Sequence, residues 1–391
     1  MANIIDYVDW RGDITFAASP FNDIDALIMT QLAMVDLSGI VPGDPSDGYI
    51  SLADAAELYF ADKKHDSEPV SVIIPSDTYV LFRRISASKR FGNIKLTAHV
   101  SRIDAEREKQ FSAITVKPGD GSVFVAFRGT DDTIVGWKED FNMSFMPTIP
   151  SQTEAAEYLD RIARRVYGKL RVAGHSKGGN LAVYAAVKCS PRARRRILTV
   201  YNYDAPGFSR EFLALPEYGE LDGRLKTVVP QSSVVGMLLE NDGKYSVIKS
   251  RESGLLQHNA FSWEVLGTEF IKLDELTKES RDMTAVMNEW LSKLDMDARK
   301  KFVDAVYNIL IATKATTVTE LNDDKYSILR ALKDTDKETR RMVIKTFGLL
   351  FGEGGKQLAG YIAGSLVRSK KDIKENKTNK NEKERKARIQ K

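Results

Sequence analysis

The sequence predicts an α/β protein in which a mostly parallel sheet is flanked by helices and followed by a C-terminal helical module. Three observations support this prediction. Between residues 154 and 229, segments with apolar residues at helical spacing alternate with short runs of β-branched residues, as parallel βαβ units do. A glycine-rich turn at 174–179 separates one of these runs from the helical segment after it. Beyond about residue 270, only helical spacing remains.

The individual elements follow from spacing and capping residues. The first hundred residues are led by helices, one expected over 21–37 and another beginning with a capping-box pattern at Ser51. Alternating β-branched and aromatic residues then predict adjacent strands at 94–100, 111–116 and 123–127. The βαβ region is expected to contain a helix at 154–166, a strand at 170–173, a helix from 176 to about 189, and strands at 197–203, 225–229 and 245–248.

The C-terminal part divides into two regions. Helical spacing at 287–294, 302–311 and 342–350 predicts an amphipathic module. From residue 369 to 391, eight Lys and two Arg stand against one Asp and three Glu, without apolar periodicity, which predicts a basic, disordered tail. We therefore expect an α/β unit over 1–270 with a helical N-terminal lead-in, a helical module over 271–368, and a tail over 369–391.

Composition excludes several classes of protein. With 391 residues, 42% hydrophobic and 29% charged, the chain is long enough for a sizeable core and unlike a disordered chain. A single cysteine, Cys189, excludes an internal disulfide and Cys-rich zinc sites and fits a reducing compartment. Four scattered histidines do not suggest a metal cluster. No apolar run reaches 18 residues and the first residues lack a signal-peptide pattern, so we expect a soluble, cytoplasmic protein.

The segment Gly174-His-Ser176-Lys-Gly178 carries the strongest chemical signal. It has the pattern Gly-x-Ser-x-Gly and lies between an expected apolar strand and an expected apolar helix, the context of a nucleophile elbow. The two glycines keep side chains out of the crowded turn, and the helix N-terminus lies behind the serine hydroxyl. Ser176 is therefore the candidate nucleophile. A glycine-rich connection of purely structural use is the alternative.

Two backbone N–H groups are expected to form the oxyanion hole. One belongs to Lys177, the residue after the nucleophile. The second is expected from Thr130, which follows the strand 123–127 in an Arg-Gly-Thr turn, and whose hydroxyl is expected to fix that loop. An ordinary turn at the end of a strand is the alternative for Thr130.

These motifs resemble those of two known families. The first group is similar to the blocks of the class 3, fungal-type lipases: Phe127-Arg-Gly-Thr130, Trp137, 152–158 and Gly174-His-Ser-Lys-Gly178. A second group resembles a bacterial family of lipase-like α/β-hydrolase proteins: Tyr7-Val-Asp-Trp10-Arg-Gly-Asp13, Pro20-Phe-Asn-Asp23, Val200-Tyr-Asn-Tyr-Asp204-Ala-Pro-Gly207 and Gln257-His258. The resemblance implies an α/β-hydrolase fold and an acyl-hydrolase site that needs no metal or organic cofactor.

The resemblance also guides the choice of base and acid. In α/β-hydrolases the triad follows the order Ser, acid, His, and His258 is the only histidine after Ser176. Class 3 lipases place the acid after the strand that corresponds to 225–229, where this chain has no carboxylate. The stretch around Asp204 resembles the Asp-Pro strand end of pancreatic-type lipases, so Asp204 is the expected acid, with Glu240, Asp242 or a dyad without an acid as alternatives.

Other features near these motifs allow two interpretations each. His65, His99 and His175 are expected to be structural, with His175 pointing away from the serine. The Lys177 side chain is expected at the pocket rim in solvent, the alternative being recognition of an anionic substrate group. The segment 137–147 falls where fungal lipases carry a lid, and it is equally compatible with a buried connection.

The expected function is that of a serine esterase or lipase acting on a small-molecule or lipid ester. The preference for esters over amides rests on the lipase resemblance alone. We expect no nucleic-acid partner, because acids interrupt the basic tail and it has no aromatic residue. The apolar, glycine-rich stretch 347–366 is expected to pack onto the rest of the protein or to self-associate, with docking on a partner or peripheral membrane contact as the alternative. The competing hypothesis is a catalytically silent, hydrolase-fold scaffold that acts through its C-terminal helices.

Overall fold

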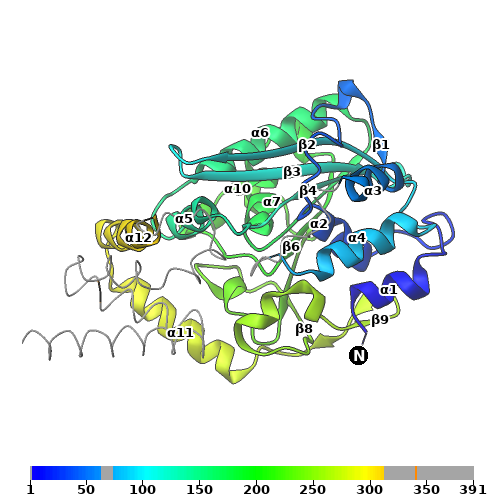
Figure 1. Ribbon diagram of the computed structural model, residues 1–391. Coiled ribbons are helices and arrows are strands. Elements are labelled where there is room, and N and C mark those ends of the chain that lie inside the picture. The colour runs from blue at the N-terminus through cyan, green and yellow to red at the C-terminus, as the bar shows by residue number, and fades with distance from the viewer. Residues whose placement is uncertain (1, 63–73, 312–339, 341–391) are drawn as a thin grey trace, which may run out of the picture.

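The computed structural model describes residues 2–62, 74–311 and 340, and its centre is a nine-stranded sheet (Figure 1). The strand order is β1-β2-β3-β4-β5-β6-β7-β8-β11. Neighbours from β4 to β8 are parallel, whereas β1 to β4 and the pair β8 and β11 are antiparallel. The sheet strands are β1 (Ile50–Ser51), β2 (Lys95–Asp104), β3 (Lys109–Lys117), β4 (Ser122–Phe127), β5 (Lys169–His175), β6 (Ile197–Tyr203), β7 (Leu225–Pro230), β8 (Ser246–Ile248) and β11 (Lys272–Leu273). This is the predicted α/β fold with flanking helices, arranged as in α/β-hydrolases.

Helices cover both faces of the sheet, because successive residues of each central strand point to opposite sides. In β4, Val123, Val125 and Phe127 pack on the side of α6 and α7, while Phe124 and Ala126 join the core under the N-terminal helices. The longer helices are α1 (Ile4–Arg11), α2 (Asp23–Leu32), α3 (Leu52–Ala61), α4 (Asp77–Ala87), α5 (Ile134–Asn142), α6 (Pro150–Arg165), α7 (Lys177–Lys188), α11 (Lys278–Ser292) and α12 (Met296–Ile311). Short helices α8 (Pro191–Arg194), α9 (Arg210–Leu213) and α10 (Pro216–Gly219) connect the later strands, and β9 (Val265–Leu266) pairs with β10 (Glu269–Phe270).

Side-chain caps define the starts of the early helices. The Asn22 side chain accepts hydrogen bonds from the backbone N–H groups of Ile24 and Asp25, and the Asp25 carboxylate accepts one from Asn22 N, which completes a capping box. Ser51 caps α3 by accepting from Asp54 N. Helix α2 begins at Asp23 and ends at Leu32, so it is shorter than the expected range of 21–37.

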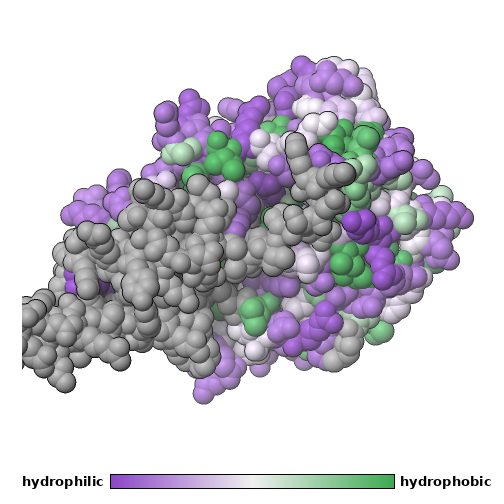
Figure 2. All heavy atoms as spheres, in the orientation of Figure 1, coloured by the Kyte–Doolittle hydropathy of each residue, from purple (hydrophilic) through white to green (hydrophobic). Residues whose placement is uncertain are grey.

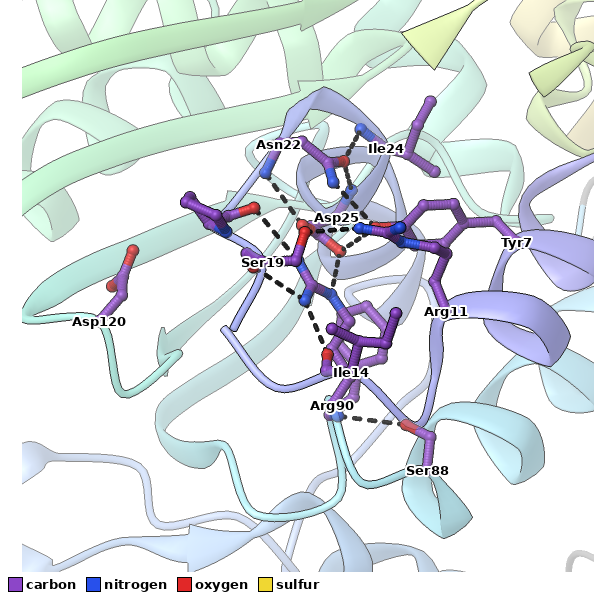
Figure 3. A network of polar contacts seen from close by, with 12 residues as sticks. Tyr7, Arg11, Ile14, Ser19, Asn22, Ile24, Asp25, Ser88, Arg90 and Asp120 are labelled. Carbon is purple, nitrogen blue, oxygen red and sulfur yellow. Dashed lines mark hydrogen bonds and ion pairs between the residues drawn. The ribbon is translucent and has the colours of Figure 1, made fainter. Parts of the chain in front are cut away.

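A buried polar network joins these N-terminal helices to one another (Figure 3). Asp25 accepts hydrogen bonds from Arg90 Nη2 at 2.5 Å, Arg90 Nε at 2.8 Å and the Tyr7 hydroxyl at 2.9 Å. Arg90 also donates to the carbonyl oxygens of Ile14 and Ser19. Both charged side chains are fully buried. The network therefore fixes α1, α2 and the residues after α4 on one face of the sheet.

The expected helices at 287–294 and 302–311 fall on α11 and α12, although α11 begins earlier and ends at Ser292. The expected helix at 342–350, the tail and His65 lie outside the described residues. Strand β11 pairs with β8 just beyond residue 270, where the sequence predicts no strand. That strand is two residues long, too short for periodicity to reveal. Figure 1 shows α12 beside α5, with which it is in contact.

On the face drawn in Figure 2, apolar side chains of described residues form small, separate patches among hydrophilic ones. Among the helices of the described ranges, none is both long enough and apolar enough to cross a bilayer.

Candidate active site

The strand-to-helix turn at Ser176 has the geometry that its glycines suggest. Ser176 follows β5 and precedes α7, with φ 59° and ψ −135°, a region that side-chain-bearing residues seldom adopt. A Cβ atom on Gly174 would lie 1.9 Å from the carbonyl oxygen of Gly178, and one on Gly178 would lie 2.2 Å from the carbonyl oxygen of Phe127. Neither position tolerates a side chain, and the turn is pressed against the end of β4.

His258 and Asp204 meet at the carboxyl ends of the parallel strands. Asp204 follows β6, and its Oδ2 lies 2.6 Å from His258 Nδ1. His258 ends a short 3₁₀ helix (Gly254–His258), which Gln257 anchors by accepting from Ser232 N and from Trp263 Nε1. The distance of 2.6 Å is typical of a charge-assisted hydrogen bond. Two of the residues expected from the sequence, 54 positions apart, are thus in direct contact.

Asp204 is fully buried and its second oxygen is also bonded. Its Oδ1 accepts from Ser233 Oγ at 2.5 Å and from Gly236 N at 3.2 Å. These donors come from the segment after β7, where class 3 lipases would carry the acid. The alternative acids have other partners: Glu240 pairs with Arg210, and Asp242 accepts from the Tyr218 hydroxyl. The donors thus lie where they orient Asp204 towards His258.

His175 packs directly against His258. Its Nε2 donates to the His258 carbonyl oxygen at 2.8 Å, the two rings stack with centroids 4.6 Å apart, and Trp263 lies against the edge of the stack. Burial, reinforced by the neighbouring His258, lowers the pKa of His175 to about 3. A neutral His175 therefore holds the backbone of the residue that is the candidate base, which agrees with its expected structural role.

The loop that contains Gly129 and Thr130 lies close to the start of α7. A Cβ atom on Gly129 would lie 2.8 Å from the His175 carbonyl oxygen and 3.3 Å from the Ser176 Cβ. The Thr130 hydroxyl donates to the Asp140 carboxylate of α5, which fixes the loop as expected. Burial raises the pKa of Asp140 to about 6, although Lys177 and the Thr130 hydroxyl oppose this rise.

The Lys177 side chain contradicts both interpretations made from the sequence. It is only 1% exposed, so it is neither solvated at a pocket rim nor available to bind a substrate anion. Its Nζ donates to Gln110 Oε1 at 2.5 Å, to the Gln110 carbonyl at 3.0 Å and to Glu139 Oε2 at 3.1 Å. Glu139 is fully buried on α5 and requires a cation beside it.

Glu139 and Gln110 are site-supporting residues that sequence reasoning missed. Glu139 accepts from Gln110 N and Ser151 N as well as from Lys177, so it ties β3, α6 and the elbow to α5. Helix α5 occupies the segment in which a lid or a buried connection was expected. The only sequence signal was the charged run Lys138-Glu-Asp140 within a stretch rich in Phe and Met. The buried ion pairs of α5 agree with a buried connection.

Among the described residues, no hydrogen bond joins Ser176 Oγ to His258 Nε2. Such contacts are often loose in unliganded sites and tighten when substrate binds. Nor does the described part of the chain contain a group of three or more His, Cys, Asp and Glu side chains placed to hold a metal ion.

The buried side chain of His99 predicts a loss of stability in acid. Burial lowers the pKa of His99 to about 4, with Asp36 opposing and Arg128 reinforcing the shift. Below the unfolded pKa of about 6.5, the unfolded chain binds a proton that folded His99 rejects, so stability falls as pH decreases towards 4. We expect His99→Gln to flatten the slope of unfolding free energy against pH by about 1.4 kcal/mol per pH unit in this range. Urea titrations at several pH values measure this slope, and an unchanged slope in His99→Gln would contradict the prediction.

The fold and this arrangement define a class: an α/β protein with the α/β-hydrolase fold, an elbow serine and a His–Asp pair at the carboxyl ends of its strands. Within that class, the chain belongs to the Mbeg1-like family, whose model matches residues 85–308, more than half of the chain. Comparison with curated proteins gives no match.

Three lipases are among the solved structures with some likeness to this chain. A fungal lipase in complex with an inhibitor has a TM-score of 0.29 and 17% identity, over 40% of this chain and 65% of that one. A deletion mutant of Rhizomucor miehei lipase with its propeptide has a TM-score of 0.31 and 16% identity, over 44% and 58%. M37 lipase has a TM-score of 0.34 and 13% identity, over 65% and 81%. The chain thus spans less than two thirds of either fungal lipase structure.

Proposed function

We propose that the protein is a serine acyl hydrolase that cleaves carboxylic esters through a covalent acyl-enzyme. The observation that carries the proposal is the 2.6 Å contact between His258 Nδ1 and buried Asp204, beside a serine held at positive φ between β5 and α7. Strained serine turns, bonded His–Asp pairs and helix N-termini are each found without catalysis. Their meeting at one edge of one sheet is typical of serine hydrolases.

The chemistry follows from the positions of the atoms. With the Nδ1 proton donated to Asp204, His258 Nε2 carries the free electron pair that accepts the Ser176 proton as Oγ attacks the ester carbonyl. The developing oxyanion is stabilised by the backbone N–H groups of Lys177 and Thr130. When the carbon–oxygen bond breaks, the imidazolium returns the proton to the leaving alcohol. Water then attacks the acyl-enzyme with the same base and releases the acid.

Asp204 has the two properties that this role requires. It is excluded from water, and its second oxygen is occupied by Ser233 and Gly236, so the first oxygen is left for His258. Its carboxylate fixes the imidazole tautomer and stabilises the imidazolium that forms during attack. The site therefore does not need a carboxylate after β7, whose absence motivated the scaffold alternative.

We expect a fluorophosphonate probe to label the wild-type protein and to label neither Ser176→Ala nor His258→Ala. Hydrolysis of p-nitrophenyl esters of increasing chain length should be lost in the same two variants. Ser190→Ala is the matched control, because Ser190 caps α8 and bonds Asp160, away from the elbow. It should be labelled like the wild type.

The outcomes separate the two hypotheses. Labelling that needs both Ser176 and His258 would support the hydrolase, and the preferred chain length would distinguish a small-molecule ester from a lipid ester. Absence of labelling in protein that is folded by circular dichroism would contradict an activated serine and favour the scaffold.

A further inference from the structure

Helix α5 makes three connections through three successive residues. Lys138 pairs with Asp304 of α12, Glu139 pairs with Lys177 of the elbow, and Asp140 accepts from the Thr130 hydroxyl. Lys177 and Thr130 are the residues whose N–H groups form the proposed oxyanion hole. One short helix therefore holds both donor residues by their side chains, and a helix from the C-terminal part of the chain holds that helix.

The contact between α5 and α12 is built around a buried cation. The Lys138 side chain is 1% exposed, its Nζ lies 5.3 Å from the centre of the Tyr307 ring, and its other carboxylate neighbour, Glu108, is 3.8 Å away. Arg299 of α12 adds a hydrogen bond of 2.8 Å to the Ser144 carbonyl, just after α5. Phe302, Val303 and Val306 bury the apolar side of α12. A buried ammonium without its carboxylate is costly, so α12 and α5 are expected to stay together.

The donor loop itself lies against α5. A Cβ atom on Gly136 would lie 3.0 Å from the Thr130 Cγ2 and 3.2 Å from Gln110 Oε1, which leaves no space between the helix and the loop. A shift of α5 must therefore move Thr130, or open a gap beside it. Because oxyanion donors act only over hydrogen-bond distances, a small displacement weakens them.

We propose that α12 positions the oxyanion hole, with Lys138 as the positioning residue that links Asp304 to the Thr130 loop and the elbow. The catalytic part of this inference rests on the proposed function. The C-terminal helices are then part of the hydrolase site rather than an attached module. Neither Lys138 nor Asp304 needs to touch substrate.

Asp304 offers a matched pair of variants, because it binds two lysines. Lys138 reaches it from α5, and Lys300 reaches it at 2.6 Å from within α12 and is 61% exposed. Asp304→Asn removes the carboxylate from both, whereas Lys300→Met removes only the partner that does not contact α5. Asp304→Glu restores the charge. Asp304 is partly exposed, so these variants are expected to fold.

The first readout is amide hydrogen exchange of full-length protein, which does not depend on activity. We expect Asp304→Asn to raise exchange about fivefold in peptides covering 128–144, and Lys300→Met and Asp304→Glu to match the wild type. Equal exchange in Asp304→Asn and Lys300→Met would overturn the positioning role, whether or not the protein hydrolyses esters.

The second readout is the kinetics of p-nitrophenyl acetate hydrolysis. We expect Asp304→Asn to lower kcat about tenfold with KM within twofold, since a displaced donor weakens the transition state more than the ground state. Wild-type kcat in that variant would overturn the catalytic part of the inference. If the wild type itself is inactive and unlabelled, the proposed function fails, while the exchange result still decides whether α12 holds the loop.

Discussion

We expect Asp204→Asn to lower kcat for p-nitrophenyl acetate by about 10³- to 10⁴-fold while leaving the fold intact. An asparagine amide can still accept from Ser233 Oγ, so its neighbours are retained. Turned towards His258, however, its NH₂ group donates to Nδ1 and selects the tautomer with the proton on Nε2. That nitrogen then cannot accept the Ser176 proton, and attack on the ester slows.

The control for this prediction is Asp242→Asn. Asp242 was an alternative acid, but it bonds the Tyr218 hydroxyl and its loop backbone rather than His258. Steady-state kinetics should give wild-type kcat for this variant, and thermal unfolding should give similar Tm values for both. A kcat within threefold of the wild type for Asp204→Asn, in folded protein, would contradict the role of Asp204 as orienting acid.

The parts of the site that could be predicted from sequence are those encoded by neighbouring residues. The nucleophile elbow is predictable because its glycines, its serine and the flanking strand and helix lie within about twenty residues. Spacing does not identify Asp204 as the acid, because that role depends on a contact with a residue 54 positions away. Resemblance to a known strand end indicated it, whereas spacing alone left Glu240 and Asp242 open.

For Lys177, sequence predicts the position in the turn but not the surroundings of the side chain. Its position in the elbow was predictable, but the direction of its side chain depends on Glu139, which reaches it from α5, 38 residues earlier. A charged residue next to a nucleophile usually implies solvent or substrate. Only the fold reveals that a fully buried carboxylate lies on the inner side of α5.

The polar network around Asp25 and Arg90 also depends on residues that lie far apart in the sequence. The capping box of Asn22 and Asp25 joins residues three positions apart, a local pattern of the kind that sequence can indicate. Sequence does not indicate that Asp25 also pairs with Arg90, 65 residues later, or that Tyr7 completes the cluster. Charge pairs of this kind leave no periodic pattern. Their stability effects are therefore predictable only from the structure.

The second large effect is expected from Arg90→Met, which should lower the free energy of unfolding by about 3–5 kcal/mol. Without the guanidinium, Asp25 keeps its Tyr7 and Asn22 bonds but loses its counter-charge in a site closed to water. The loops that present the Ile14 and Ser19 carbonyls to Arg90 lose their donor as well. Urea unfolding followed by far-UV circular dichroism measures the change.

The matched control is Arg84→Met, because Arg84 also pairs with an aspartate of the N-terminal region but does so in solvent. The Arg84 and Asp9 side chains are 51% and 46% exposed, so their pair is expected to contribute less than about 1 kcal/mol. The double variant Arg90→Met with Asp25→Asn should be more stable than Arg90→Met alone, since the unpaired charge is then gone. If Arg90→Met and Arg84→Met lower the free energy of unfolding by the same small amount, the Asp25–Arg90 pair does not anchor the N-terminal helices. Their attachment to the sheet then rests on apolar contacts alone.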